Sequence, residues 1–139
     1  QHLINLGCKN IALVSSVDNL SVGKLRADGY LKALKDNNIP VANFIGHSDI
    51  APKRKVDPNK YFPWQLLAQN GFGNWYDTAA TKQLPVNFNA MQSLRIIGYD
   101  TRDSLSAVRA FKLHFVQQDS ILQINEADKK IIYELSKKY

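Results

Sequence analysis

The stretch at residues 46–58 constrains the fold most, because it places a histidine, a lysine and an aspartate in one short loop. It reads Gly-His-Ser-Asp-Ile-Ala-Pro-Lys-Arg-Lys-Val-Asp-Pro and follows an apolar run at residues 43–45. We interpret that run as the core of a buried strand, which would deliver His47 at its end while the proline-bearing loop returns Asp57. Imidazole nitrogen and carboxylate oxygen are ordinary zinc ligands, and a catalytic zinc keeps one coordination position open for water. The pattern therefore predicts two metal ligands presented by one loop.

The same stretch resembles the signature of the type-2 N-acetylmuramoyl-L-alanine amidases, the AmpD/AmiD-like zinc amidases. That family's pattern, G-H-S-D-I-A-P-x-R-K-x-D-P followed by aromatic-Pro-Trp, matches residues 46–58 and 62–64. These enzymes cut the bond between the lactyl group of muramic acid and L-alanine in peptidoglycan. The resemblance implies that His47 and Asp57 are zinc ligands and that Lys55 stabilises the oxyanion of the tetrahedral intermediate.

Each of these residues also has a simpler interpretation. His47 would be a histidine at a strand end without a metal, and Asp57 would be a carboxylate paired with Lys55 or Arg54. For Asp49, which lies inside the motif, we favour the role of a hydrogen-bond acceptor in a turn.

Composition sets broader limits. The chain has 139 residues, of which 45% are hydrophobic, enough to bury the core of one domain or slightly more. It contains one cysteine, Cys8, so an internal disulfide is excluded. No run is long and apolar enough to span a bilayer, no signal peptide is expected, and the start at Gln1 suggests processing or truncation. The formal charge of +6 favours anionic partners in general, such as DNA or wall polymer, but we favour the simpler interpretation of a solvated basic surface.

The segment before the motif predicts an α/β fold. A buried strand is expected at residues 10–15, a helix that ends at residues 36–38, and a second strand at residues 43–46. This order is a βαβ unit with a small, mainly parallel sheet and a right-handed crossover.

The first 41 residues are similar to the effector domain of LacI/GalR-type repressors. The similarity lies in the pattern H-L-I-x-L-G-x-x-x-I-A at residues 2–12 and R-x-x-G-Y-x-x-A-L at residues 26–34. The simplest hypothesis is a chimera, in which a repressor-like segment (1–41) precedes an amidase-like part that begins near residue 42. Such a join would remove catalytic residues, because the amidase family takes a second zinc histidine and a catalytic glutamate from its N-terminal half. His2 reads as a partly exposed helical histidine, and Ser15 and Ser16 are no substitutes for a general base.

Residues 42–80 continue the amidase-like part. Pro63 is predicted to open a helix at residues 64–68, which ends at residues 70–71. Phe72, Trp75 and Tyr76 follow it and either stack on sugar rings of the substrate or close the core. Residues 81–89 read as a polar linker.

Residues 90–139 are predicted to form a three-helix bundle. Apolar residues recur at helical spacing, namely Met91, Leu94, Ile97, Leu105, Val108, Phe111, Phe115, Ile131, Ile132 and Leu135. The segment resembles the peptidoglycan-binding domain of longer amidases, except that residues 122–124 replace the usual Asp-Gly. His114 is interpreted as a surface residue.

The sequence therefore predicts a partial zinc-dependent N-acetylmuramoyl-L-alanine amidase that is inactive as this chain. The alternatives are a non-catalytic peptidoglycan-binding module, an artificial chimeric fold without activity, and a fragment of a LacI-type regulator. Peptidoglycan or muropeptides are the expected partners, DNA is not expected, and exchange of segments between chains would give a homo-oligomer. The amidase resemblance implies the cell envelope or periplasm, whereas the repressor-like segment implies the cytoplasm.

Overall fold

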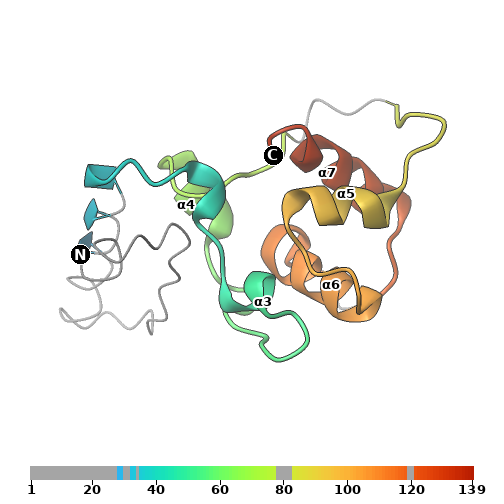
Figure 1. Cartoon of the computed structure of the whole chain (residues 1–139), viewed down its shortest axis with the longest axis horizontal. Coiled ribbons are helices and arrows are strands. Elements are labelled where there is room, and N and C mark those ends of the chain that lie inside the picture. The colour runs from blue at the N-terminus through green and yellow to red at the C-terminus, as the bar shows by residue number, and fades with distance from the viewer. Residues whose placement is uncertain (1–27, 30–31, 34, 78–82, 119–120) are drawn as a thin grey trace.

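The structure, a computed structural model, describes residues 28–29, 32–33, 35–77, 83–118 and 121–139. These residues form helices joined by loops, and no strand occurs among them. In chain order the elements are η1 (Val41–Asn43), α3 (His47–Ile50), α4 (Trp64–Gln69), α5 (Ala90–Ile97), α6 (Ser104–Phe111), η2 (Lys112–Val116) and α7 (Glu126–Ser136). Figure 1 shows α5, α6 and α7 gathered at one end of the molecule, with α3 beside α6.

The predicted βαβ unit with a parallel sheet is wrong for the part of the chain that the structure describes. Of the strand expected at residues 43–46, Asn43 is the last residue of the 3-10 turn η1 and residues 44–46 are irregular chain. Backbone N–H groups find local partners there, since Asn43 donates to the Pro40 carbonyl at 2.9 Å and Phe44 to the Val41 carbonyl at 3.1 Å. Phe44 is buried, and its ring packs on Phe72 at 5.3 Å between centroids, whereas no strand of the described residues covers it. A short apolar run does not distinguish these two situations.

The predicted strand at residues 10–15 lies outside the described residues, as does the start of the helix after it. The predicted end of that helix is confirmed. Asn37 donates its side-chain amide to the Ala33 carbonyl at 2.7 Å, and Asn38 adopts φ +52°, a left-handed conformation that stops a helix. The helix predicted after the motif is also confirmed as α4, which ends at Asn70.

The three predicted C-terminal helices are confirmed as α5, α6 and α7. Each begins at a residue whose side chain accepts a hydrogen bond from the first helical turn, namely Asn89, Asp103 and Asn125. Such residues compete with the backbone inside helices and are favoured at helix starts, which is why these boundaries are readable from sequence. Gly98 ends α5 with φ +114°, which a residue with a side chain rarely adopts.

The core lies between these three helices. It consists of Leu94, Ile97, Tyr99, Ala107, Val108, Ala110, Phe111, Phe115, Ile132 and Leu135. Leu105, predicted to join it, is 60% exposed, and the alanines of α6 face inward instead. These small side chains leave room for the larger residues of α5 and α7.

An ion pair is buried beside this core. Lys112 Nζ lies 3.1 Å from Asp128 Oδ2, and both side chains are 2% exposed. Asp128 also accepts a hydrogen bond from the backbone N–H of Asn125 at 2.9 Å. The pair therefore ties η2 to the first turn of α7.

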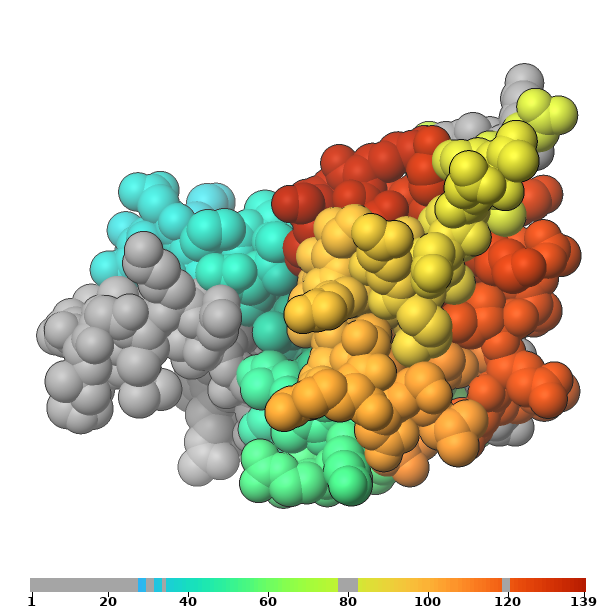
Figure 2. All heavy atoms as spheres, turned by 45° about the vertical axis from the view of Figure 1, so that its right-hand side comes forward, coloured from blue at the N-terminus to red at the C-terminus, as the bar shows by residue number. Residues whose placement is uncertain are grey.

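Figure 2 shows how the motif region meets this helical region. The green surface that contains α3 and the loop after it lies directly against the orange surface of α6. The motif is thus supported by the helical region.

Candidate functional site

His47 and Asp57 meet at the start of α3. Gly46 is the N-cap of this helix, His47 is its first residue, and the loop after it returns so that the Ser48 N–H donates to the Asp57 carbonyl at 2.9 Å. His47 Nδ1 then lies 2.7 Å from Asp57 Oδ2. The side chains are 33% and 45% exposed, so both remain accessible from solvent.

The hydrogen bond between these two side chains is the main cause that lowers the pKa of Asp57 below its usual value. The positive charge of Lys55 contributes in the same direction. The partner of the Asp57 carboxylate is His47, whereas the simpler interpretation of the sequence expected Lys55 or Arg54. The two groups converge from opposite ends of one loop, as the motif predicts.

The donors at this site match zinc in kind but supply only two of its ligands. Imidazole and carboxylate both bind zinc, which takes four ligands in most protein sites. Among the described residues, no group of three or more His, Cys, Asp or Glu side chains comes together. The pair thus fits part of a zinc site, and the assignment of His47 and Asp57 as zinc ligands stays a prediction.

Lys55 lies on the loop between the two candidate ligands. Its side chain is exposed, and its backbone N–H donates to the Ala51 carbonyl at 2.9 Å. Its proximity to Asp57 is consistent with a cation beside the reaction centre, and its role as oxyanion donor stays a prediction.

Asp49 accepts the turn hydrogen bond expected of it, from the Gly46 N–H at 2.7 Å. It also accepts from Tyr99 Oη–H at 2.7 Å, and its Oδ2 lies 2.8 Å from His114 Nδ1. The side chain is only 7% exposed. Asp49 therefore joins the motif loop to the helical region, a role that its position in the sequence does not reveal.

His114, interpreted from the sequence as a surface residue, is buried and 3% exposed. Its ring stacks on Trp64 of the motif region, with centroids 3.9 Å apart. The sequence interpretation assumed one continuous α-helix, whereas η2 is a π-helical turn. A π-turn holds an extra residue, so it changes which side chains face inward. His114 and Phe115 both point into the protein as a result.

The three predicted aromatic contacts pack against the protein. Phe72 lies on Phe44, while Trp75 stacks on Tyr76 at 5.0 Å and tilts against Phe115 at 5.7 Å between centroids. Burial raises the pKa of Tyr76. This placement agrees with the core-closing interpretation of Trp75 and Tyr76, and a contact of any of the three with substrate stays a prediction.

Comparison with known proteins connects this site to amidases. No family model matches the chain. N-acetylmuramoyl-L-alanine amidase AmiD of Escherichia coli is 34% identical over 93 residues, which cover 56% of this chain and 34% of AmiD. The 1,6-anhydro-N-acetylmuramyl-L-alanine amidase AmpD of Haemophilus influenzae is 47% identical over 36 residues, 26% of this chain and 16% of AmpD.

Solved structures agree. The complex of E. coli AmiD with the substrate anhydro-N-acetylmuramic acid-L-Ala-D-γ-Glu-L-Lys superposes with a TM-score of 0.68 and 28% identity, over 84% of this chain and 52% of that one. Two crystal structures of AmpDh3 from Pseudomonas aeruginosa, one with an anhydromuramic pentapeptide, give a TM-score of 0.69 and 28% identity over 89% of this chain and 56% of theirs.

The chain thus resembles the AmiD/AmpD-type amidases, and the match covers about a third of the AmiD sequence and about half of the solved AmiD chain. These comparisons provide no evidence for a LacI/GalR-type segment or for a chimera. Residues 1–27 lie outside the described residues, so the repressor resemblance rests on the sequence pattern alone. No helix in the described part of the chain has the length and apolarity needed to cross a bilayer.

Proposed function

We propose that this chain is part of a zinc-dependent N-acetylmuramoyl-L-alanine amidase for muropeptides or peptidoglycan fragments, and that alone it hydrolyses them weakly or not at all. The observation that carries the proposal is the pairing of His47 with Asp57 at 2.7 Å inside the amidase motif. The similarity to AmiD over 56% of the chain supports it. By the same similarity, the parent enzyme would work in the cell envelope.

The reaction would add water to the carbonyl of the lactyl amide and release the amino group of L-alanine. A bound zinc ion would supply Lewis acidity toward the water and the carbonyl. His47 and Asp57 would hold two of its coordination positions. The Lys55 ammonium would offset the negative charge that develops on the carbonyl oxygen.

The expectation of low activity follows from the histidines in the chain. The full sequence has three histidines, and His114 is buried against Asp49. Only His2 remains as a further imidazole ligand, and it lies outside the described residues. The sequence also has no match to the family's catalytic glutamate. A zinc held by two protein ligands binds weakly, and water addition then lacks its general base.

Binding of peptidoglycan without hydrolysis is the second candidate function. It is favoured by the C-terminal helical region, which has its own buried core and is similar in pattern to a peptidoglycan-binding domain. In this case the His47 loop would serve as a structural support for that region.

Metal analysis and a hydrolysis assay on the full chain test the proposal. We expect zinc to bind measurably, to be lost in His47→Ala and Asp57→Asn, and to be retained in the matched surface variant Asp36→Asn. Release of peptide from anhydro-N-acetylmuramic acid-L-Ala-D-γ-Glu-L-Lys should stay near background. Rapid zinc-dependent release would contradict the expected inactivity. Equal zinc content in wild type and His47→Ala would contradict the metal site.

A further inference from the structure

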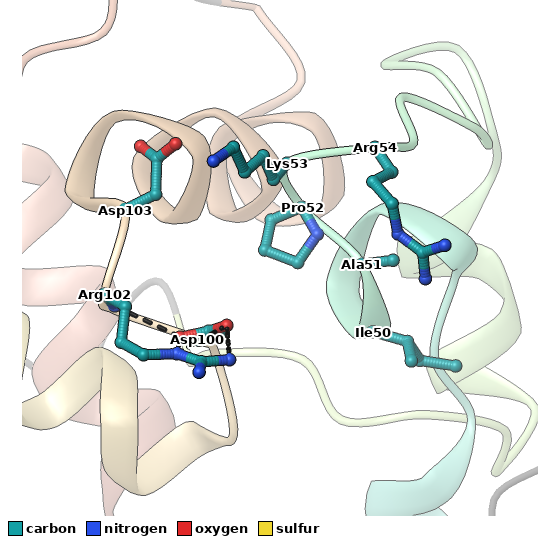
Figure 3. Close-up of a pocket in the computed structure, with 8 residues that line it drawn as sticks. All are labelled: Ile50, Ala51, Pro52, Lys53, Arg54, Asp100, Arg102 and Asp103. Atoms are coloured by element: carbon teal, nitrogen blue, oxygen red, sulfur yellow. Dashed lines mark hydrogen bonds and ion pairs between the residues drawn. The ribbon is translucent and has the colours of Figure 1, made fainter.

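An open pocket of about 530 Å³ lies where the loop after α3 meets the loop between α5 and α6. Figure 3 shows its lining, which comes from Ile50, Ala51, Pro52, Lys53, Arg54, Asp100, Arg102 and Asp103. The pocket contains neither His47 nor Asp57, but it begins at the last residue of the helix that His47 opens. Its volume is in the range of pockets that hold small organic ligands.

Three cationic and two acidic side chains line this pocket, and the acids are already engaged. Asp100 Oδ2 lies 2.7 Å from Arg102 Nη2, and Arg102 Nε donates to Asp100 Oδ1 at 2.9 Å. This pairing lowers the pKa of Asp100 to about 2. Asp103 Oδ1 accepts from the Ser106 N–H at 3.1 Å and thereby caps α6. The hydrogen bonds with Ser106 chiefly lower the pKa of Asp103, and the charges of Lys53 and Arg109 lower it further, so this carboxylate offsets the Lys53 charge only in part.

The cationic side chains can still donate hydrogen bonds to a ligand. The Arg102 side chain is 90% exposed, and a guanidinium carries five N–H donors, so its pairing with Asp100 leaves donors that face solvent. Lys53 and Arg54 are exposed and have no ion-pair partner in the ranges that the structure describes. In Figure 3, Lys53 extends toward Asp103, while the Arg54 guanidinium lies on the other side of Ala51. Positive charge is thus distributed along the pocket instead of at one point.

Between these charges the wall is apolar and anchored. Ile50 is 51% exposed at the pocket edge. The Pro52 carbonyl accepts a hydrogen bond from Arg109 Nη2 of α6 at 2.7 Å, which fastens the loop to the helical region. A pocket held in place before binding loses less entropy when a ligand arrives.

We propose that this pocket binds the free carboxylates of a peptidoglycan stem peptide. The inference rests on the proposed function, because a muropeptide whose glutamate is linked through its γ-carboxyl keeps the α-carboxylate free. Separated cations with apolar surface between them suit a short peptide that carries carboxylates at intervals. A single inorganic phosphate would use one cation and none of the apolar wall, so the peptide is the better match.

Chemical-shift titration of the full-length chain tests this inference. The probes are the tripeptide L-Ala-γ-D-Glu-L-Lys, its analogue with the glutamate α-carboxylate converted to an amide, and inorganic phosphate. The variants are Lys53→Gln and Arg102→Gln, and Lys130→Gln on the exposed face of α7 is the matched control. Losing one charge-assisted hydrogen bond should weaken tripeptide binding about tenfold in the two pocket variants and leave Lys130→Gln unchanged. The amide analogue should bind more weakly to the wild type.

Three results would overturn the inference. The first is equal tripeptide affinity in Lys53→Gln, Arg102→Gln and Lys130→Gln. The second is a set of shifts that maps away from residues 50–54 and 100–103. The third is phosphate binding as tight as tripeptide binding, which would make the pocket a general anion site. Sedimentation of the wild-type chain with insoluble peptidoglycan separates these outcomes from failure of the proposed function. A chain that still sediments binds the wall polymer at a place other than this pocket.

Discussion

Gly46 occupies a position where no side chain fits. A Cβ there would lie 2.6 Å from Pro58 Cδ and 3.1 Å from Trp64 Cζ2. Pro58 directly follows Asp57, so relief of the clash would move the carboxylate away from His47. We expect Gly46→Ala to lower the free energy of unfolding by about 1–3 kcal/mol, measured by urea denaturation, and to weaken zinc binding.

Gly29 provides the control for this change. It lies in a helical stretch, and a Cβ there would meet nothing within 4 Å. Gly29→Ala should leave stability unchanged or raise it by roughly 0.5–1 kcal/mol, because alanine loses less backbone entropy in a helix. Equal destabilisation by both substitutions would show that close packing at Gly46 is not the cause.

At the scale of elements, η2 decides how the helical region is joined together. This π-turn continues α6 and directs Lys112 and His114 inward. Lys112 then pairs with Asp128 in α7, whereas His114 reaches Asp49 in the motif region. One short element thus contacts both halves of the described structure.

The Lys112–Asp128 ion pair is expected to be costly to break from one side. Lys112→Met would leave Asp128 buried without its cation, so we expect a loss of about 3–5 kcal/mol in the free energy of unfolding. The comparison is Lys129→Met, which breaks the partly exposed pair with Glu126, at 2.6 Å, and should cost less than about 1 kcal/mol. Denaturant titration of both variants checks this. Similar losses of unfolding free energy in the two variants would contradict the expectation that burial makes the Lys112–Asp128 pair more costly to break.

At the scale of the whole molecule, Asp49 connects the motif loop to the helical region. It accepts hydrogen bonds from both sides of that contact, and Trp64 stacks on His114 next to it. We therefore expect the described part of the chain to unfold as one cooperative unit. Tryptophan fluorescence, which reports on Trp64 and Trp75, and circular dichroism at helical wavelengths should show the same midpoint.

Asp49→Asn tests this coupling. The new amide nitrogen cannot accept a hydrogen bond, so at least one buried donor loses its partner, which costs about 1–3 kcal/mol. Hydrogen exchange should then speed up in both α3 and α6. Asp36→Asn, which removes an exposed pair with Lys32, should change little. Faster exchange confined to α3 would contradict the coupling.

Local chemistry made part of this structure predictable. Asn89, Asp103 and Asn125 mark helix starts because their side chains serve the first turn, and Gly98 marks a helix end because of its positive φ. The closeness of His47 and Asp57 was also predictable, because both belong to one loop whose motif is specific. The strand predicted at residues 43–46 is wrong, because the contact of Phe44 with the distant ring of Phe72 leaves no local trace in the sequence.

Residues close together in the chain were enough to predict the existence of α4, α5, α6 and α7, the loop that carries both His47 and Asp57, and the amidase resemblance. Only the tertiary structure decided that Asp49 joins two regions, that His114 is buried and that the basic pocket exists. Those features combine residues about 50 or more positions apart, and for His114 the π-turn η2 also changes which side chains of the helix face inward.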